Sequence, residues 1–124
     1  MVAAGKLKHL GLIALLAIVF TSCGQAYKTH RLVKDFMTQD MHLSDFDVVQ
    51  WSDIRPALFV TDSALQAIHS RAEKTQLVRK DLKYAPRTRR LNFIHVTYAL
   101  GQDTVKQTFY LDDKMEGIVG VKGN

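Results

Sequence analysis

The chain has 124 residues and a single cysteine, so a disulfide bond within the chain cannot support its fold. Its 17 Lys and Arg against 12 Asp and Glu give a formal net charge of +5 at pH 7, an excess too mild to indicate a polyanion-binding protein by itself. The length suits one domain and excludes two domains of ordinary size.

The first predicted element is an export signal at the N-terminus. A short basic stretch with Lys6 and Lys8 precedes eleven uncharged and mainly apolar residues, 10–20. As a helix these residues would extend about 16 Å, roughly half of the hydrocarbon core of a bilayer. We therefore expect a cleaved signal peptide over residues 1–22 rather than a permanent spanning helix. Loss of its two lysines lowers the net charge from +5 to +3.

Small residues surround the only cysteine at the expected cleavage boundary, in the order Thr21-Ser22-Cys23-Gly24. This tetrapeptide resembles the lipobox of bacterial lipoprotein precursors, although Phe20 stands where that family most often has Leu. The resemblance covers residues 1–24 and implies that Cys23 becomes the acylated first residue of the mature chain, held at a membrane by its acyl groups. Gly24 stands where family members kept at the inner membrane tend to have Asp. The resemblance therefore implies the outer membrane, with the periplasmic and external sides both left open.

The mature chain, residues 23–124, is expected to form one domain that opens with a helix. Apolar side chains recur at spacings near three and four over residues 27–38, with charged side chains between them. This spacing predicts an amphipathic helix. We expect Val33, Phe36 and Met37 to form the stripe that faces the core.

A strand and a second helix are predicted next. Residues 45–51 are rich in β-branched and aromatic side chains, and the Arg55-Pro56 pair that follows disfavours helix. The second helix is expected to begin within residues 61–63, where Ser63 opens a capping box.

The last third of the chain predicts a meander of three strands. Residues 91–100 and 104–111 carry alternating β-forming side chains on either side of Gly101, so each strand is expected to have one solvent-facing side. A second turn over residues 112–117 leads to a final strand at 118–121. The order helix, strand, helix and meander predicts an α+β fold in which two helices pack on an antiparallel sheet.

This order of elements over residues 27–122 resembles small exported α+β domains of the cystatin-like and NTF2-like folds. In those folds a curved sheet wraps a helix. No shared motif accompanies the resemblance, so it implies a fold and no activity.

Basic side chains are dense between residues 71 and 90. This segment holds eight basic residues against two acidic ones, and the basic ones are Arg71, Lys74, Arg79, Lys80, Lys83, Arg87, Arg89 and Arg90. One interpretation is a solvated helix end and loop that keeps a sheet edge from self-pairing. The other is a surface for an anionic partner, such as lipid headgroups, glycolipid phosphates or an acidic envelope protein. Nucleic acid is not an expected partner of an exported protein.

Catalytic and metal-binding motifs are missing from the mature sequence. It has no G-x-S-x-G motif and no serine followed by lysine three residues later. The acidic residues and histidine between positions 40 and 47 lack a recognised ligand spacing. We therefore expect no metal and no cofactor.

Two functions remain open. The leading hypothesis is a non-enzymatic envelope lipoprotein that binds a partner protein or an anionic glycolipid. The alternative is a small-molecule pocket protein or enzyme of the NTF2-like or cystatin-like type. Its pocket would lie between the second helix and the meander, walled by Trp51, His69, His95 and Tyr98.

Overall fold

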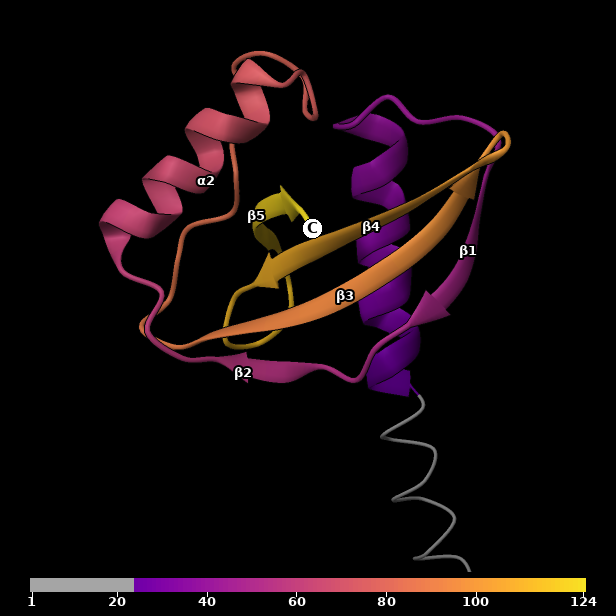
Figure 1. Cartoon of the computed structure of the whole chain (residues 1–124). Coiled ribbons are helices and arrows are strands. Elements are labelled where there is room, and N and C mark those ends of the chain that lie inside the picture. Colours follow the sequence, from indigo (N-terminus) through magenta and orange to yellow (C-terminus); the bar gives the residue numbers. More distant parts are fainter. Residues whose placement is uncertain (1–23) are drawn as a thin grey trace, which may run out of the picture. The chain divides into compact units, whose positions relative to one another are not determined.

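The computed structural model describes residues 24–124, and it has the α+β fold (Figure 1). Internal contacts divide the chain into Met1–His30 and Arg31–Asn124, and the second unit holds the sheet. The elements are a helix over residues 24–39, followed by β1 Phe46–Trp51, β2 Arg55–Ala57, α2 Asp62–Lys74, β3 Leu91–Leu100, β4 Asp103–Leu111 and β5 Ile118–Gly123. The predicted order of helix, strand, helix and C-terminal strands is confirmed.

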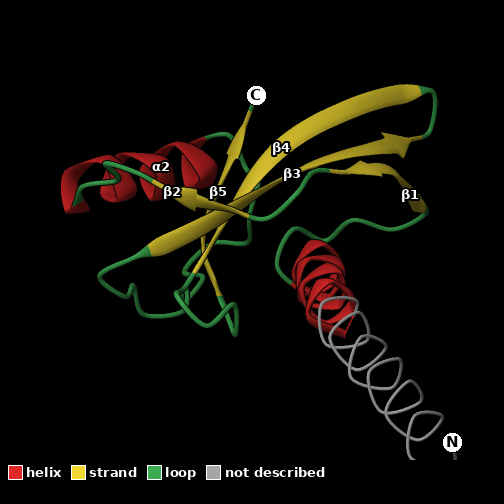
Figure 2. Cartoon of the chain, turned by 90° about the horizontal axis from the view of Figure 1, so that it is seen from below, coloured by secondary structure: helices red, strands yellow, loops and turns green. Residues whose placement is uncertain are grey.

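The strands form one antiparallel sheet in the order β1-β3-β4-β5 (Figure 2). The short strand β2 was not predicted, and it pairs with β3 beyond the end of β1. Pro56 is tolerated in β2 because an edge strand does not need every backbone N–H for pairing. Ser52, which lies between β1 and β2, also bonds to β3. Its backbone N–H donates to His95 O at 2.9 Å, and its Oγ accepts from His95 N at 2.8 Å.

A tight turn joins β3 to β4, and it begins at Gly101. Leu100 pairs with Asp103, so only two residues form the loop. Gly101 has φ of 64°, a left-handed conformation that glycine adopts without steric cost. The hairpin predicted around Gly101 is confirmed, and β4 begins one residue earlier than expected.

The larger core lies between the helical residues 31–39 and one face of the sheet. Val33, Phe36 and Met37 are at most 5% exposed, which confirms the predicted stripe. They belong to one apolar cluster with residues of β3, β4 and β5: Ile94, Val96, Tyr98, Phe109, Leu111, Ile118 and Val121. The rings of Phe36 and Phe109 meet edge to face, with centroids 6.0 Å apart.

A smaller core corrects the expectation that each strand of the hairpin has one solvent-facing side. Leu91 and Tyr110 are buried with Val119 and with Leu65 of α2. The helix approaches β5 closely at Gly120, where an added Cβ would lie 3.2 Å from Leu65 Cδ1. Sequence alternation alone did not indicate this layer, because it forms only where α2 covers part of the sheet.

Helix α2 begins within the predicted window, but Ser63 is not its cap. Thr61 is the N-cap residue, and its Oγ1 accepts a hydrogen bond from Ala64 N at 3.1 Å. This contact satisfies one of the backbone N–H groups that the first turn leaves free.

The segment between α2 and β3 is irregular, as predicted, yet it contributes to the core. Val78 is buried, and Tyr84 stacks on His69 of α2 with ring centroids 3.9 Å apart. Ala85 N donates to Ile118 O at 3.0 Å, and His69 Nε2 donates to Val119 O at 2.6 Å. Carbonyl groups of β5 are therefore satisfied from outside the sheet, which blocks part of that strand for pairing with another chain.

Candidate functional site

The predicted lipid-attachment residue, Cys23, and the predicted signal peptide at residues 1–22 lie outside the described residues. Their roles stay predictions. From residue 24 onward, no helix combines the length and apolar character that crossing a membrane requires.

The eight basic residues of the segment 71–90 do not form one surface. Lys74, Arg79 and Lys80 line a cleft of about 770 Å³ at the C-terminal end of α2. Arg87 and Arg89 line a shallow, open depression at the N-terminal end of the same helix. Because α2 has 13 residues, its two ends are separated by roughly 18 Å. Arg71 and Lys83 line two further hollows, so the basic residues that are close in sequence are dispersed in the fold.

Two of these basic side chains form ion pairs with acidic side chains. Arg79 Nε lies 2.9 Å from Asp40 Oδ1, and Arg87 Nη1 lies 2.8 Å from Asp62 Oδ1. Within residues 24–124, the other six form no ion pair: Arg71, Lys74, Lys80, Lys83, Arg89 and Arg90. Of the eight basic residues, these six have a charge that no acid among residues 24–124 pairs with.

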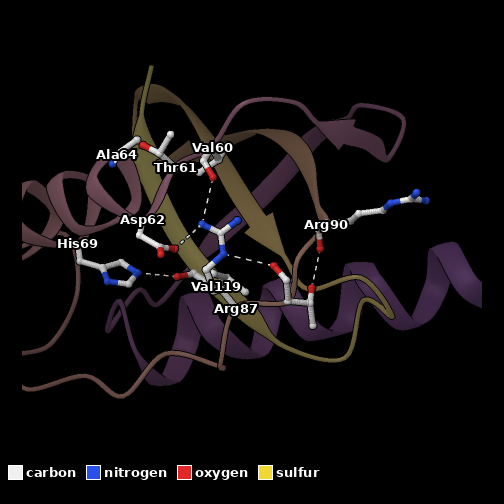
Figure 3. Close-up of polar contacts among 9 residues, drawn as sticks. Val60, Thr61, Asp62, Ala64, His69, Arg87, Arg90 and Val119 are labelled. Atoms are coloured by element: carbon white, nitrogen blue, oxygen red, sulfur yellow. Dashed lines mark hydrogen bonds and ion pairs between the residues drawn. The ribbon is translucent and has the colours of Figure 1, made fainter.

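Arg87, in the segment before β3, forms hydrogen bonds with residues at the start of α2 (Figure 3). Its Nη1 donates to Val60 O at 3.0 Å as well as to Asp62, and its Nε donates to Thr88 O at 3.3 Å. The side chain is only 28% exposed. These contacts give Arg87 a structural role at the start of α2, and its predicted role in binding an anionic partner stays a prediction. In the same view Arg90 extends away from this contact.

Arg87 contacts the short loop of residues 58–61 between β2 and α2. This loop presents two large apolar side chains to solvent. Leu58 is 72% exposed and Phe59 is 95% exposed. Phe59 has φ of 65°, a conformation that costs a non-glycine residue about 1–2 kcal/mol. Sequence reasoning missed this loop. The available signal was an apolar pair outside every predicted helix and strand.

The four residues expected to wall a pocket do not come together. Tyr98 is buried in the larger core, where its hydroxyl donates to Gln107 Oε1 at 2.9 Å. His95 is exposed on the opposite side of β3, with Nδ1 2.8 Å from Thr108 Oγ1. Trp51 is partly buried against the larger core, and His69 is engaged by Val119 O and Tyr84.

A groove nevertheless lies between α2 and β5, with different residues in its wall. Its volume is about 730 Å³. The lining includes apolar side chains and two cations: Ile68, Arg71, Ala72, Leu77, Val121 and Lys122. Lys122 Nζ also lies 5.9 Å from the ring centroid of Tyr110, within cation–π range.

Tyr84 carries the one buried side-chain polar atom that lacks a hydrogen-bond partner among residues 24–124, its hydroxyl oxygen. Burial, with smaller effects from Glu73 and Asp40, raises the pKa of Tyr84 from 10.0 to about 12. Its ring stacks on His69 and lies near Phe36, so we regard it as a packing residue with an unsatisfied hydroxyl.

No group of three or more His, Cys, Asp or Glu within residues 24–124 is arranged to hold a metal ion. Comparison of the chain with protein-family models, with curated proteins and with solved structures finds no match.

Proposed function

We propose that the chain is the precursor of an envelope lipoprotein, tethered through acylated Cys23, whose α+β domain binds an anionic envelope component without catalysing a reaction. The observation that carries the tether is the position of the only cysteine, between small residues and directly after an apolar run of signal-peptide length. A lone cysteine in an exported chain needs a specific explanation, and acylation supplies one.

The binding role is supported by the free arginines beside the loop at the start of α2. Arg55, Arg89 and Arg90 are all exposed and form no ion pair among the described residues. Arg87 nearby is occupied by Val60 O and Asp62. The anionic partner is therefore expected to meet the three free arginines, and Arg87 is expected to hold the surface in place.

The tether is tested by replacing Cys23 and following the chain in envelope fractions. Wild-type protein is expected in the outer-membrane fraction and to incorporate labelled palmitate. Cys23→Ala should appear as a released domain or as an unprocessed precursor without the label. Ser22→Ala is the matched control, because it keeps a small residue at the cleavage site. Unchanged fractionation and processing of Cys23→Ala would contradict the tether.

The groove between α2 and β5 favours a second candidate, a small-molecule pocket protein. A volume of about 730 Å³ lies within the range of small-molecule sites. This candidate predicts that small amphipathic anions raise the melting temperature and that Arg71→Glu abolishes the increase. An equal increase in the melting temperature of Arg71→Glu would exclude the groove as the binding site of these anions.

A further inference from the structure

Leu58 and Phe59 stand out among the exposed apolar side chains of the molecule. Within residues 24–124, four large hydrophobic residues are strongly exposed, Tyr27, Val49, Leu58 and Phe59, and only the last two are neighbours in sequence. Two adjacent apolar side chains facing water are unfavourable in isolation, since burial of either would be stabilising. Their exposure therefore calls for a partner.

The loop is held firmly on both sides, so the exposure of Phe59 is not a result of a loose chain. On one side Ala57 pairs with Leu91 in the sheet. On the other side Val60 O accepts from Arg87, and Thr61 caps α2. Between these fixed points Phe59 takes a left-handed φ of 65°, which is disfavoured for a residue with a Cβ atom. The fold keeps the aromatic ring pointing outward.

Arginine is frequent in the two chain segments next to this loop, and the acidic turn at residues 112–113 approaches one of them through the hydrogen bond from Asp113 N to Thr88 Oγ1. The segments 55–62 and 87–90 contain four arginines and one acid, Asp62, which is already bonded to Arg87. Arg55 pairs with Phe93 at one end of the β2–β3 pairing, Arg90 directly precedes Leu91 at the other end, and Arg89 lines a shallow, open depression beside Val60 and Thr61. An apolar tip with unpaired arginines in the adjoining segments is complementary to a surface that has anionic headgroups above an apolar layer.

We propose that Leu58 and Phe59 insert into the headgroup boundary of an anionic membrane while Arg55, Arg89 and Arg90 contact lipid phosphates. This inference rests on the proposed function, which places the chain at a membrane, and it identifies the anionic partner as the lipid surface itself. Two side chains cover at most a few hundred Å², below the roughly 800 Å² that each partner contributes to a standard protein interface. A fluid lipid surface adapts to a protruding tip and needs no matching shape.

The test uses the full, acylated chain reconstituted in vesicles. The chain has one cysteine, so acylation leaves no free thiol and Phe59→Cys supplies a unique labelling site. A polarity-sensitive fluorophore at position 59 is expected to enter an apolar environment and to be quenched by brominated lipid on vesicles containing phosphatidylglycerol. The matched control is Gln102→Cys in the β3–β4 turn, where the fluorophore should remain in water.

Removal of charge gives the second arm of the test. Each arginine near an anionic surface contributes about 1 kcal/mol, so Arg89→Ala with Arg90→Ala should lower the ratio of inserted to free loop by about thirtyfold. Equal insertion in vesicles of phosphatidylcholine alone would overturn the role of the arginines. A fluorophore that stays in water on anionic vesicles would overturn insertion and leave a protein partner as the explanation of the exposed pair.

The same sample separates failure of this inference from failure of the proposed function. Intact-mass measurement reports whether Cys23 is acylated, independently of the fluorophore. An acylated chain whose position 59 remains in water contradicts the inference alone. A chain without acyl groups contradicts the proposed function, whatever the fluorophore reports.

Discussion

Replacement of Arg87 by alanine should destabilise the domain, whereas replacement of its exposed neighbours should not. Arg87 donates to Val60 O, a partly buried contact, and such a bond from a charged group contributes about 1.5–3 kcal/mol. The ion pair adds at most about 1 kcal/mol, because the Asp62 side chain is 89% exposed. We expect Arg87→Ala to lower the free energy of unfolding by about 2–3 kcal/mol.

Urea denaturation followed by circular dichroism measures this change, and thermal unfolding gives an independent value. For a domain of this size the expected loss corresponds to a fall in melting temperature on the order of 10 °C. Arg89→Ala and Arg90→Ala are the matched controls, and each should stay within about 0.5 kcal/mol of wild type. Equal losses in all three variants, or no loss in Arg87→Ala, would refute the distinction between a clamping arginine and free arginines.

Three further substitutions test the packing around α2. Gly120→Val should cost about 1–3 kcal/mol on urea denaturation, because its Cβ would press on Leu65 Cδ1 at 3.2 Å; a neutral result would contradict the close approach. His69→Ala should cost about 1–3 kcal/mol by leaving Val119 O without its donor, and wild-type stability would contradict that contact. Tyr84→Phe should be neutral or slightly stabilising, because the hydroxyl has no partner. The folded pKa of Tyr84 is raised from 10.0 to about 12, so wild-type stability should fall as pH rises between these values. The fall should be smaller in Tyr84→Phe, and equal pH profiles would argue against burial of the hydroxyl.

The sequence predicts most of the fold because its patterns there are local. The stripe of Val33, Phe36 and Met37 is a helical repeat, and the hairpin has alternating residues on either side of Gly101. Strand β2 escaped prediction because three residues centred on Pro56 carry almost no periodic signal. The buried Val78 was missed for a different reason: it packs through contacts distant in sequence, which no local pattern reports.

The candidate site depends even more on distant contacts. Eight basic residues within twenty positions look like one surface when the chain is read in order. Folding disperses them over several places and pairs Arg79 and Arg87 with acids 39 and 25 positions away. The apolar pair Leu58 and Phe59 is visible in the sequence. Its exposure to solvent is not, because that depends on the pairing of β2 and on the contact of Arg87 with Val60 O.

Mass spectrometry of the protein extracted from envelopes tests directly whether Cys23 anchors the mature chain to a membrane. We expect an N-terminal peptide that begins at Cys23 and carries a diacylglycerol on its thiol and an acyl chain on its amine. A mature chain that begins at another residue, or a Cys23 with an unmodified thiol, would contradict it.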